Sequence, residues 1–213
     1  MGSKKISKGC AYLTVLYVAA LIISNVITSR QVQLPFGLTM TGATFVFPIT
    51  YILSDVFSEC YGYKWSRTTC YLAFAMNAFM VLVFMLVLKS PAPAWWENKA
   101  AFETVLSSTP RVVFASFTAF ILGDWANDKV FQKMKLKHAD MKGFGARAIL
   151  SSLIGEAVDC AIFNPLAFWG TMPVATFVRM AVLQVALKTG YELIILPVTA
   201  HIARKVNAYE SLV

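Results

Sequence analysis

The feature that most limits what this chain can fold into is a series of apolar segments of about 20 residues, separated by short polar gaps. A hydrocarbon core about 30 Å thick needs roughly that length of helix. With 58% hydrophobic and 14% charged residues, the chain has too few polar side chains to cover a soluble globule. The sequence therefore predicts an all-α integral membrane protein of six transmembrane helices, with windows at about 10–29, 43–60, 68–88, 111–128, 148–169 and 178–203.

The gaps between these windows are too short for a separate soluble domain, so we expect a single transmembrane bundle over 1–213. The first window is longer than a signal-peptide core and has no small-x-small cleavage site, which favours a retained span. We expect an extracytoplasmic connection over 31–41, a long interfacial loop over 89–110, a basic cytoplasmic loop over 129–142 and a short last connection over 170–173.

The basic residues divide unevenly between the two sides of a six-span arrangement. One side holds only four, namely Arg30, Lys89, Lys99 and Arg111. The other holds thirteen, and the positive-inside rule then places both termini in the cytoplasm. We interpret the net charge of +8 as a topology signal, not as a nucleic-acid-binding surface. The thirteen are Lys4, Lys5, Lys8, Lys64, Arg67, Lys129, Lys133, Lys135, Lys137, Lys142, Arg147, Arg204 and Lys205.

Three spans down and three spans back make the two halves antiparallel, and the middle window of each half carries an acidic pair. The pairs are Asp55 with Glu59, and Glu156 with Asp159. Many transporters are built as such 3+3 inverted repeats, with the substrate site at the repeat interface near the membrane midplane. We therefore predict an inverted repeat with its site among these acids.

A charge at the bilayer centre costs roughly 2.5–3.5 kcal/mol, so intramembrane ionisable residues tend to be paired or to line a polar cavity. Asp55 and Glu59 are spaced i, i+4 on one helical face. Arg67 begins the next window within reach of Glu59. Two interpretations of these residues stay open. They form a salt bridge at the cytoplasmic helix boundary, or they take part in substrate binding.

The fifth and sixth windows carry the densest polar groups. Ser152, Glu156 and Asp159 share one face among small residues, which predicts either a ligand site or a structural polar seam. Gln184, Lys188 and Glu192 form a stripe in the sixth window, and a Lys188 to Glu192 pair is the expected resting state. The predicted substrate-binding residues are Asn25, Phe45, Asp55, Glu59, Ser152, Glu156, Asp159, Lys188, Tyr191 and Glu192, with Arg67 and Asp128 in structural or gating roles.

Catalytic and cofactor-binding patterns are missing from the sequence. The four cysteines form no C-x-x-C pair, and His138 and His201 map to the cytoplasmic edge, so we expect no metal site and no cofactor. There is no G-x-S-x-G elbow and no Gly-rich phosphate loop. We therefore expect a protein that is not an enzyme and has no ATPase of its own; an intramembrane enzyme or an ion channel is a weaker reading.

Several short motifs occur in order along the chain: Ser24-Asn25; Phe45-x-Phe47-Pro48 with Ser54-Asp55, Tyr61-Gly62 and Arg67; Ala115-Ser116-Phe117 with Leu122-Gly123 and Asp128-x-Val130-Phe131; Ser151-Ser152-Leu153-x-Gly155 with Asp159 and Phe163; and Lys188 ahead of Leu196-Pro197. Together they resemble the bacterial vitamin uptake transporter family, also called the queuosine precursor transporters. Two departures are Glu156, where an uncharged amide is more usual, and Cys160, where a threonine is usual.

The resemblance implies a multi-pass protein of the bacterial cytoplasmic (inner) membrane that imports 7-deazaguanine precursors of queuosine for tRNA modification salvage. The expected substrates are the 7-cyano base, the 7-aminomethyl base or queuine, moved by alternating access. A substrate-binding subunit of an ATP-driven vitamin importer is the alternative. Expected partners are this small molecule and membrane lipid but no nucleic acid, and a homodimer is compatible with the apolar surface of a small bundle.

Overall fold

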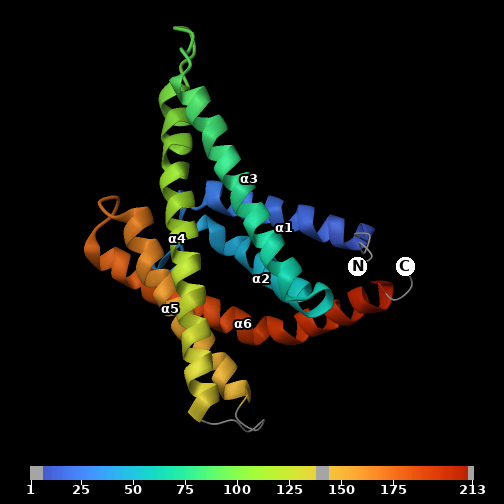
Figure 1. The fold of residues 1–213 in the computed structure, drawn as a ribbon. Helices are drawn as coiled ribbons and strands as arrows, with labels where there is room; N and C mark the ends of the chain where they lie inside the picture. Colours follow the sequence, from blue (N-terminus) through green and yellow to red (C-terminus); the bar gives the residue numbers. More distant parts are fainter. Residues whose placement is uncertain (1–6, 138–143, 211–213) are drawn as a thin grey trace. The chain divides into compact units, whose positions relative to one another are not determined.

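The computed structural model describes residues 7–137 and 144–210. Helices make up most of this part of the chain, and their order can be followed in Figure 1. The elements are α1 (Lys8–Ile27), β1 (Gln31–Gln33), η1 (Pro35–Gly37), β2 (Thr39–Thr41), η2 (Gly42–Phe45), α2 (Phe47–Val56), η3 (Phe57–Tyr61), α3 (Tyr63–Lys89), α4 (Lys99–Lys137), α5 (Phe144–Phe168) and α6 (Val174–Glu210).

Contacts along the backbone divide the chain into two compact units. Unit 1 contains Met1–Arg30, Thr41–Thr109 and Glu192–Val213, and unit 2 contains Gln31–Met40 and Pro110–Tyr191. Helices α4 and α6 each contribute to both units. We describe each unit by itself, and the single-domain interpretation of the sequence stays a prediction.

Unit 1 is built on α1, which packs against α2 and α3. Ser7 starts α1 because its side chain accepts a hydrogen bond from the backbone N–H of Cys10, a donor that the first turn leaves without a helical partner. The core includes Tyr17 of α1 and Phe57 of η3, whose rings meet edge to face with centroids 6.0 Å apart.

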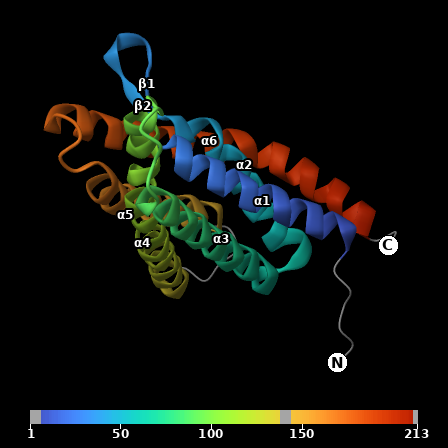
Figure 2. The ribbon, with the colours of Figure 1, turned by 90° about the horizontal axis from the view of Figure 1, so that it is seen from above.

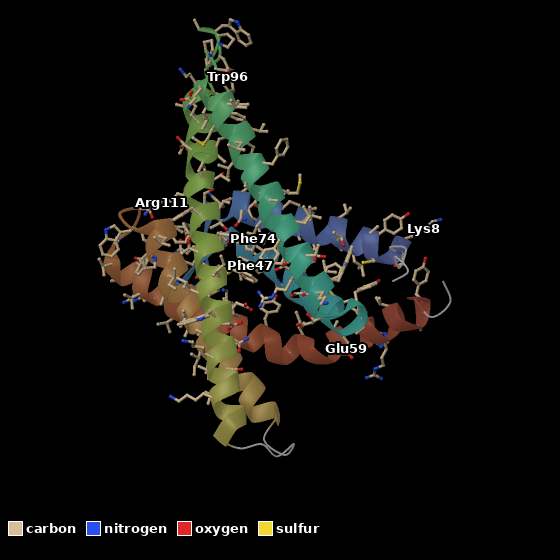
Figure 3. All side chains as sticks on the ribbon, in the orientation of Figure 1. Lys8, Phe47, Glu59, Phe74, Trp96 and Arg111 are labelled. Carbon is tan, nitrogen blue, oxygen red and sulfur yellow. The ribbon has the colours of Figure 1, made fainter. Side chains whose placement is uncertain are left out.

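The segment between α2 and α3 is a single π-helical turn, η3, which ends at Gly62. Gly62 has φ 84° and ψ 162°, a conformation that a residue with a Cβ rarely adopts. Single π-turns are often found at functional sites. This turn carries Glu59, which Figure 3 labels at the end of the helix.

In unit 2, α4 and α5 cross at two glycines. A Cβ added to Gly123 would lie 2.9 Å from the carbonyl oxygen of Gly155, and one added to Gly155 would lie 2.8 Å from the Cβ of Asn127. Only glycine permits two helix backbones to approach this closely. At the other end of α5, a layer of Ala115, Ala167, Phe168 and Met180 is buried.

Within the described part of the chain, three helices are long and apolar enough to cross a membrane: α1, Lys64–Lys89 of α3 and Lys99–Asn127 of α4, with mean hydropathies of 2.1, 2.4 and 1.5. These helices agree with the predicted all-α membrane protein. The count of six spans, the inverted repeat and the orientation of the termini stay predictions.

The prediction of a long loop over 89–110 is wrong. Helix α4 begins at Lys99, so the connection covers only 90–98, and Pro110 lies inside the helix. The segment that follows Lys99 is rich in residues that favour helix, and a Lys99 to Glu103 ion pair of 3.9 Å spans its first turn. The loop predicted over 129–142 is likewise helical through Lys137, and residues 138–143 lie outside the described residues.

Two further segments differ from the prediction. The segment over 31–41 forms the β1–β2 hairpin that follows α1 (Figure 2), and its tip residue Phe36 is fully exposed with φ 64°. The window predicted as one helix over 43–60 is divided into η2, α2 and η3. Backbone turns of this kind depend on local hydrogen bonds, such as Leu34 N–H to Leu38 O at 2.7 Å, which hydropathy does not report.

Candidate functional site

Helices α5 and α6 carry a polar cluster in which each acid meets a partner on the other helix. The ammonium nitrogen Nζ of Lys188 lies 2.5 Å from Oδ2 of Asp159. The hydroxyl of Thr189 donates to Oε2 of Glu156 at 3.1 Å. Glu156 and Asp159 are three residues apart on α5 and therefore share a face, and consecutive residues of α6 meet them. We call Glu156, Asp159, Lys188 and Thr189 the polar cluster.

The polar cluster is partly shielded from the surroundings. The side chain of Lys188 is 17% exposed and that of Asp159 is 24% exposed. In so shielded a place an ion pair is favoured over two separate charges, because each charge has lost most of its solvent. Most of the flanking α5 residues, Leu153, Ile154, Ala157 and Val158, are apolar, so these charges interrupt an otherwise hydrophobic helix.

The glycine crossing brings a third helix to the cluster. A Cβ added to Gly123 of α4 would lie 3.0 Å from the Cβ of Asp159, besides its contact with Gly155. The backbone of α4 thus passes directly beside the acid that Lys188 binds. Gly155, one of the small residues of the fifth window, allows this close approach of the two helices.

Other predicted residues of α4, α5 and α6 are less defined. Gln184 is buried one turn before Lys188, and Tyr191 is 41% exposed. The side chains of Ser152, Asp128 and Glu192 lie outside the described residues. The Lys188 to Glu192 pair therefore stays a prediction, and the partner of Lys188 that the structure does show is Asp159, on a different helix.

Asn25, predicted from its position in the first window, is buried in unit 1. Its Nδ2 donates to Oδ1 of Asn77 at 2.8 Å, and Nδ2 of Asn77 donates to the carbonyl of Ala73 at 2.8 Å. This chain of hydrogen bonds ties α1 to α3. The structure thus gives Asn25 an architectural role, and its part in substrate binding stays a prediction.

The remaining predicted residues also belong to unit 1. Asp55 and Glu59 are exposed, Arg67 is half-buried, and Phe45 is 67% exposed in η2. The salt bridge between Glu59 and Arg67, and the part of Asp55, Glu59 and Phe45 in substrate binding, stay predictions.

One buried polar residue of α5 was missed by the sequence analysis. Asn164 is completely buried, and its side-chain oxygen Oδ1 has no hydrogen-bond partner among the described residues. The signal was present in the sequence, since Asn164 follows Glu156 by eight residues and lies near the same face. An amide next to a proline is also typical of a helix end, so the sequence alone does not distinguish Asn164 as a site residue.

The polar cluster can bind a donor-rich solute. Its carboxylates accept N–H hydrogen bonds or balance a cation, its hydroxyl can donate or accept, and its ammonium donates. Within the described ranges, no group of three or more His, Cys, Asp or Glu side chains is placed to hold a metal ion. The carboxylates, hydroxyl and ammonium of the cluster are suited to reversible binding by hydrogen bonds and charge.

Comparison with known proteins identifies the family of the chain. Residues 41–202 match the family model described as "Putative vitamin uptake transporter". The chain is also 26% identical over 186 residues to a protein of Bacillus subtilis (strain 168) named "Probable queuosine precursor transporter", a match that covers 87% of this chain and 80% of that protein. No solved structure matches the chain. Since the family model covers most of its length, the chain belongs to the vitamin uptake transporter family.

Proposed function

We propose that this protein imports 7-deazaguanine precursors of queuosine, namely the 7-cyano base, the 7-aminomethyl base or queuine, across the bacterial cytoplasmic membrane. The observation that carries the proposal is the polar cluster, with Lys188 2.5 Å from Asp159 and Thr189 bound to Glu156, in helices of a membrane transporter family. The name of the Bacillus subtilis relative supplies the substrate class.

The chemistry of a guanine-like base fits these groups. Such a base presents two N–H donor groups beside a carbonyl acceptor on one edge, and a ring-nitrogen acceptor beside a further N–H on the opposite edge. Carboxylates such as Asp159 and Glu156 accept the donors, and Lys188 donates to an acceptor. An aminomethyl substituent is a cation and gains further from the second carboxylate, so the extra acid at Glu156 favours the 7-aminomethyl base.

The proposed transport cycle depends on breaking the contacts between α5 and α6. A ligand that accepts from Lys188 or donates to Asp159 competes with their ion pair, and so changes the stability of the α5–α6 contact. A carboxylate that takes up a proton in one state and releases it in the other supplies the energy coupling, with Glu59, Glu156 and Asp159 as the proposed carriers. An uptake rate that does not change with an imposed proton gradient would contradict this coupling.

Uptake of labelled bases by cells tests the transport function. We would express the chain in bacteria that lack their own uptake route and compare it with Asp159→Asn and Lys188→Met variants at equal abundance. We expect saturable uptake by the parent. Both variants should lose uptake by about tenfold or more, and tenfold corresponds to about 1.4 kcal/mol of binding free energy. Arg179→Met is the matched control, since Arg179 is an exposed basic residue of the same helix.

Binding of the three bases to the purified protein distinguishes a carrier from a substrate-binding subunit and from a protein with a different substrate. Binding without uptake would favour the alternative of a substrate-binding subunit that needs an ATP-driven partner. Neither binding nor uptake of any of the three bases, by a protein that is correctly inserted in the membrane, would overturn the proposed substrate class.

A further inference from the structure

The side chain of Asn164 has an orientation that leaves one polar atom without a partner. Its Nδ2 donates to the carbonyl oxygen of Cys160, one turn back on α5, at 3.0 Å. This bond turns Oδ1 away from the α5 backbone. The residue is fully buried, and Oδ1 has no hydrogen-bond partner in the described part of the chain. Because folded proteins satisfy nearly all buried polar atoms, an unsatisfied amide oxygen requires an explanation.

Asn164 differs from the other described residues that have a buried side-chain atom without a partner. Nε1 of Trp65 is a donor, and the other amide oxygen, Oε1 of Gln31, belongs to a residue that is only half-buried. Ser24 and Thr69 carry hydroxyls, which can rotate and donate to a carbonyl one turn back on their own helices. An amide oxygen is only an acceptor, so Oδ1 of Asn164 can be satisfied only by a donor that comes from elsewhere. The structure therefore leaves at this position a fixed acceptor that is complementary to an N–H or O–H group.

The register of the α5–α6 hairpin places this acceptor next to the polar cluster. Lys188 meets Asp159, and two turns away Met180 packs in one layer with Ala167 and Phe168. The two contacts fix an antiparallel register in which Gln184, which is also buried, lies at the level of Asn164. The amides of Asn164 and Gln184 thus lie between the polar cluster and the apolar layer.

The surroundings of Asn164 fit an aromatic solute better than a structural water. A buried water makes two to four hydrogen bonds. The α5 residues adjacent to Asn164 on the buried side are Cys160, Ala167 and Phe168, whose side chains offer weak hydrogen-bonding groups or none. A water here would have only the amides of Asn164 and Gln184 as strong partners among the described side chains, the smallest number that a buried water makes. The rings of Phe163 and Phe168 meet edge to face, 5.8 Å apart, so aromatic surface flanks the amide along the helix. A flat ring with N–H groups on its edge matches both features.

We propose that Asn164 determines substrate specificity, because its side-chain oxygen accepts a hydrogen bond from an N–H on the edge of the bound base. This inference rests on the proposed function, and it names the residue that reads the guanine-type edge. Carboxylates of the polar cluster attract any donor-rich or cationic solute, whereas a neutral, fully buried acceptor discriminates by shape and by the position of one N–H.

Equilibrium binding to the purified full chain in lipid nanodiscs tests the proposal. The probes are 7-cyano-7-deazaguanine, its counterpart without the 2-amino group, and its N1-methylated counterpart, measured on the parent and on Asn164→Leu. Leucine has the branched shape and the same number of side-chain heavy atoms as asparagine, but it has no polar atoms. We expect the substitution to weaken binding of the complete base by about tenfold or more. For one of the two analogues it should have no effect, because the N–H that Asn164 reads is already missing.

The unfolding midpoint of Asn164→Leu distinguishes a specificity role from a structural role. A structural role predicts a lower midpoint, whereas a specificity role predicts an unchanged or higher one. Replacing an unsatisfied buried amide by a hydrocarbon of similar shape leaves the unfolding midpoint of the protein unchanged or raises it. Cys160→Ala, one turn away on the same helix, is the matched control and should affect all three probes alike.

The outcomes separate this inference from the proposed function. If the parent binds the bases and Asn164→Leu binds them equally well, or loses affinity for all three probes by one factor, the role of Asn164 is overturned and the transport function stands. If the parent binds none of the probes, the proposed function fails and the inference fails with it.

Discussion

Two buried amide sites in this protein differ in whether their hydrogen bonds are complete. In unit 1, Asn25 and Asn77 bind one another at 2.8 Å, and Asn77 also donates to Ala73. In unit 2, Asn164 is as deeply buried, but its oxygen has no partner among the described residues. A buried hydrogen bond left unmade costs about 1–3 kcal/mol. The first site therefore stabilises the fold, whereas the second keeps an acceptor at the expense of stability.

The ionisable residues of the two units show a related difference. Asp55 and Glu59 of unit 1 are exposed, whereas Asp159 of unit 2 is shielded and is held by Lys188 on another helix. A shielded charge needs a partner to compensate for the solvent it has lost. The polar groups of unit 2 therefore depend on one another, and substitutions there should have larger effects.

The largest effect is expected from Lys188→Met. Removing one partner of a buried ion pair typically costs about 3–5 kcal/mol because the other charge is left uncompensated, and partial exposure here lowers that to about 2–3 kcal/mol. We expect a lower free energy of unfolding in detergent micelles, measured by circular dichroism, together with loss of uptake.

The double variant Lys188→Met with Asp159→Asn separates the two effects of this pair. Without either charge, stability should recover by about 1 kcal/mol or more, since no carboxylate is left unpaired. Uptake should stay lost. Recovery of both would mean that the pair serves only the fold, and the exposed Arg179→Met should change neither.

A smaller loss is expected from Gly155→Val, which places side-chain atoms at the crossing of α4 and α5. The first added carbon would lie 2.8 Å from the Cβ of Asn127, so the helices must separate. Overpacking of this kind costs about 1–3 kcal/mol. Thermal unfolding of the purified protein measures it.

Gly190→Ala is the matched control for this crossing. Gly190 is also helical, but nothing lies within 4 Å of an added Cβ. Alanine is favoured over glycine inside a helix by about 0.5–1 kcal/mol, so this variant should be as stable as the parent or more stable. Equal losses in both variants would contradict a specific close approach at Gly155.

The amide comparison itself predicts opposite changes in stability for similar substitutions. Asn25→Ala leaves Oδ1 of Asn77 buried without its donor and should lower the free energy of unfolding by about 1–2 kcal/mol. Asn164→Leu should leave it unchanged or raise it. Chemical denaturation of both variants measures the difference, and a larger loss for Asn164→Leu would show that its amide is structural.

Part of the fold could be predicted from hydropathy because lipid imposes length and apolarity on a spanning helix. The windows at 10–29 and 68–88 correspond to α1 and α3 within a few residues. The family was predicted from several motifs in order, and the family model confirms it. The start of α4 was not predicted, because Pro110 and the hydroxyl residues before it resemble a loop. In the helix, Ser108 and Thr109 instead donate to the carbonyl of Val105.

The site was predictable only within single helices. Spacing along one helix correctly grouped Glu156 with Asp159 on a shared face, because 3.6 residues per turn fixes that relation. Spacing could not identify Asp159 as the partner of Lys188. That contact depends on the register of the α5–α6 hairpin, set by the turn at Gly170, whose φ is 80°. Nor could it reveal that Oδ1 of Asn164 lacks a partner, which requires all its neighbours in space.

The smallest effect is expected at helix ends, where the two units again differ in how they complete hydrogen bonds. At the end of α1, the hydroxyl of Thr28 donates to the carbonyl of Ser24, a partner on the same helix. At the end of α5, Arg111 of α4 donates from Nε to the carbonyl of Leu166 at 2.6 Å and from a terminal nitrogen to that of Trp169 at 2.9 Å (Figure 3). These carbonyls have no partners further along the helix.

Arg111→Lys tests whether this contact between α4 and α5 depends on geometry or on charge. Lysine keeps the favourable charge at a helix C-terminus but cannot reproduce two hydrogen bonds from one planar group. Because Arg111 is exposed, we expect Arg111→Ala to lower the free energy of unfolding by only about 0.5–1 kcal/mol, and Arg111→Lys to restore about half of that. Full recovery with lysine would mean that charge alone matters. Lys99→Ala, which removes an exposed pair within α4, should change stability by no more than about 0.5 kcal/mol.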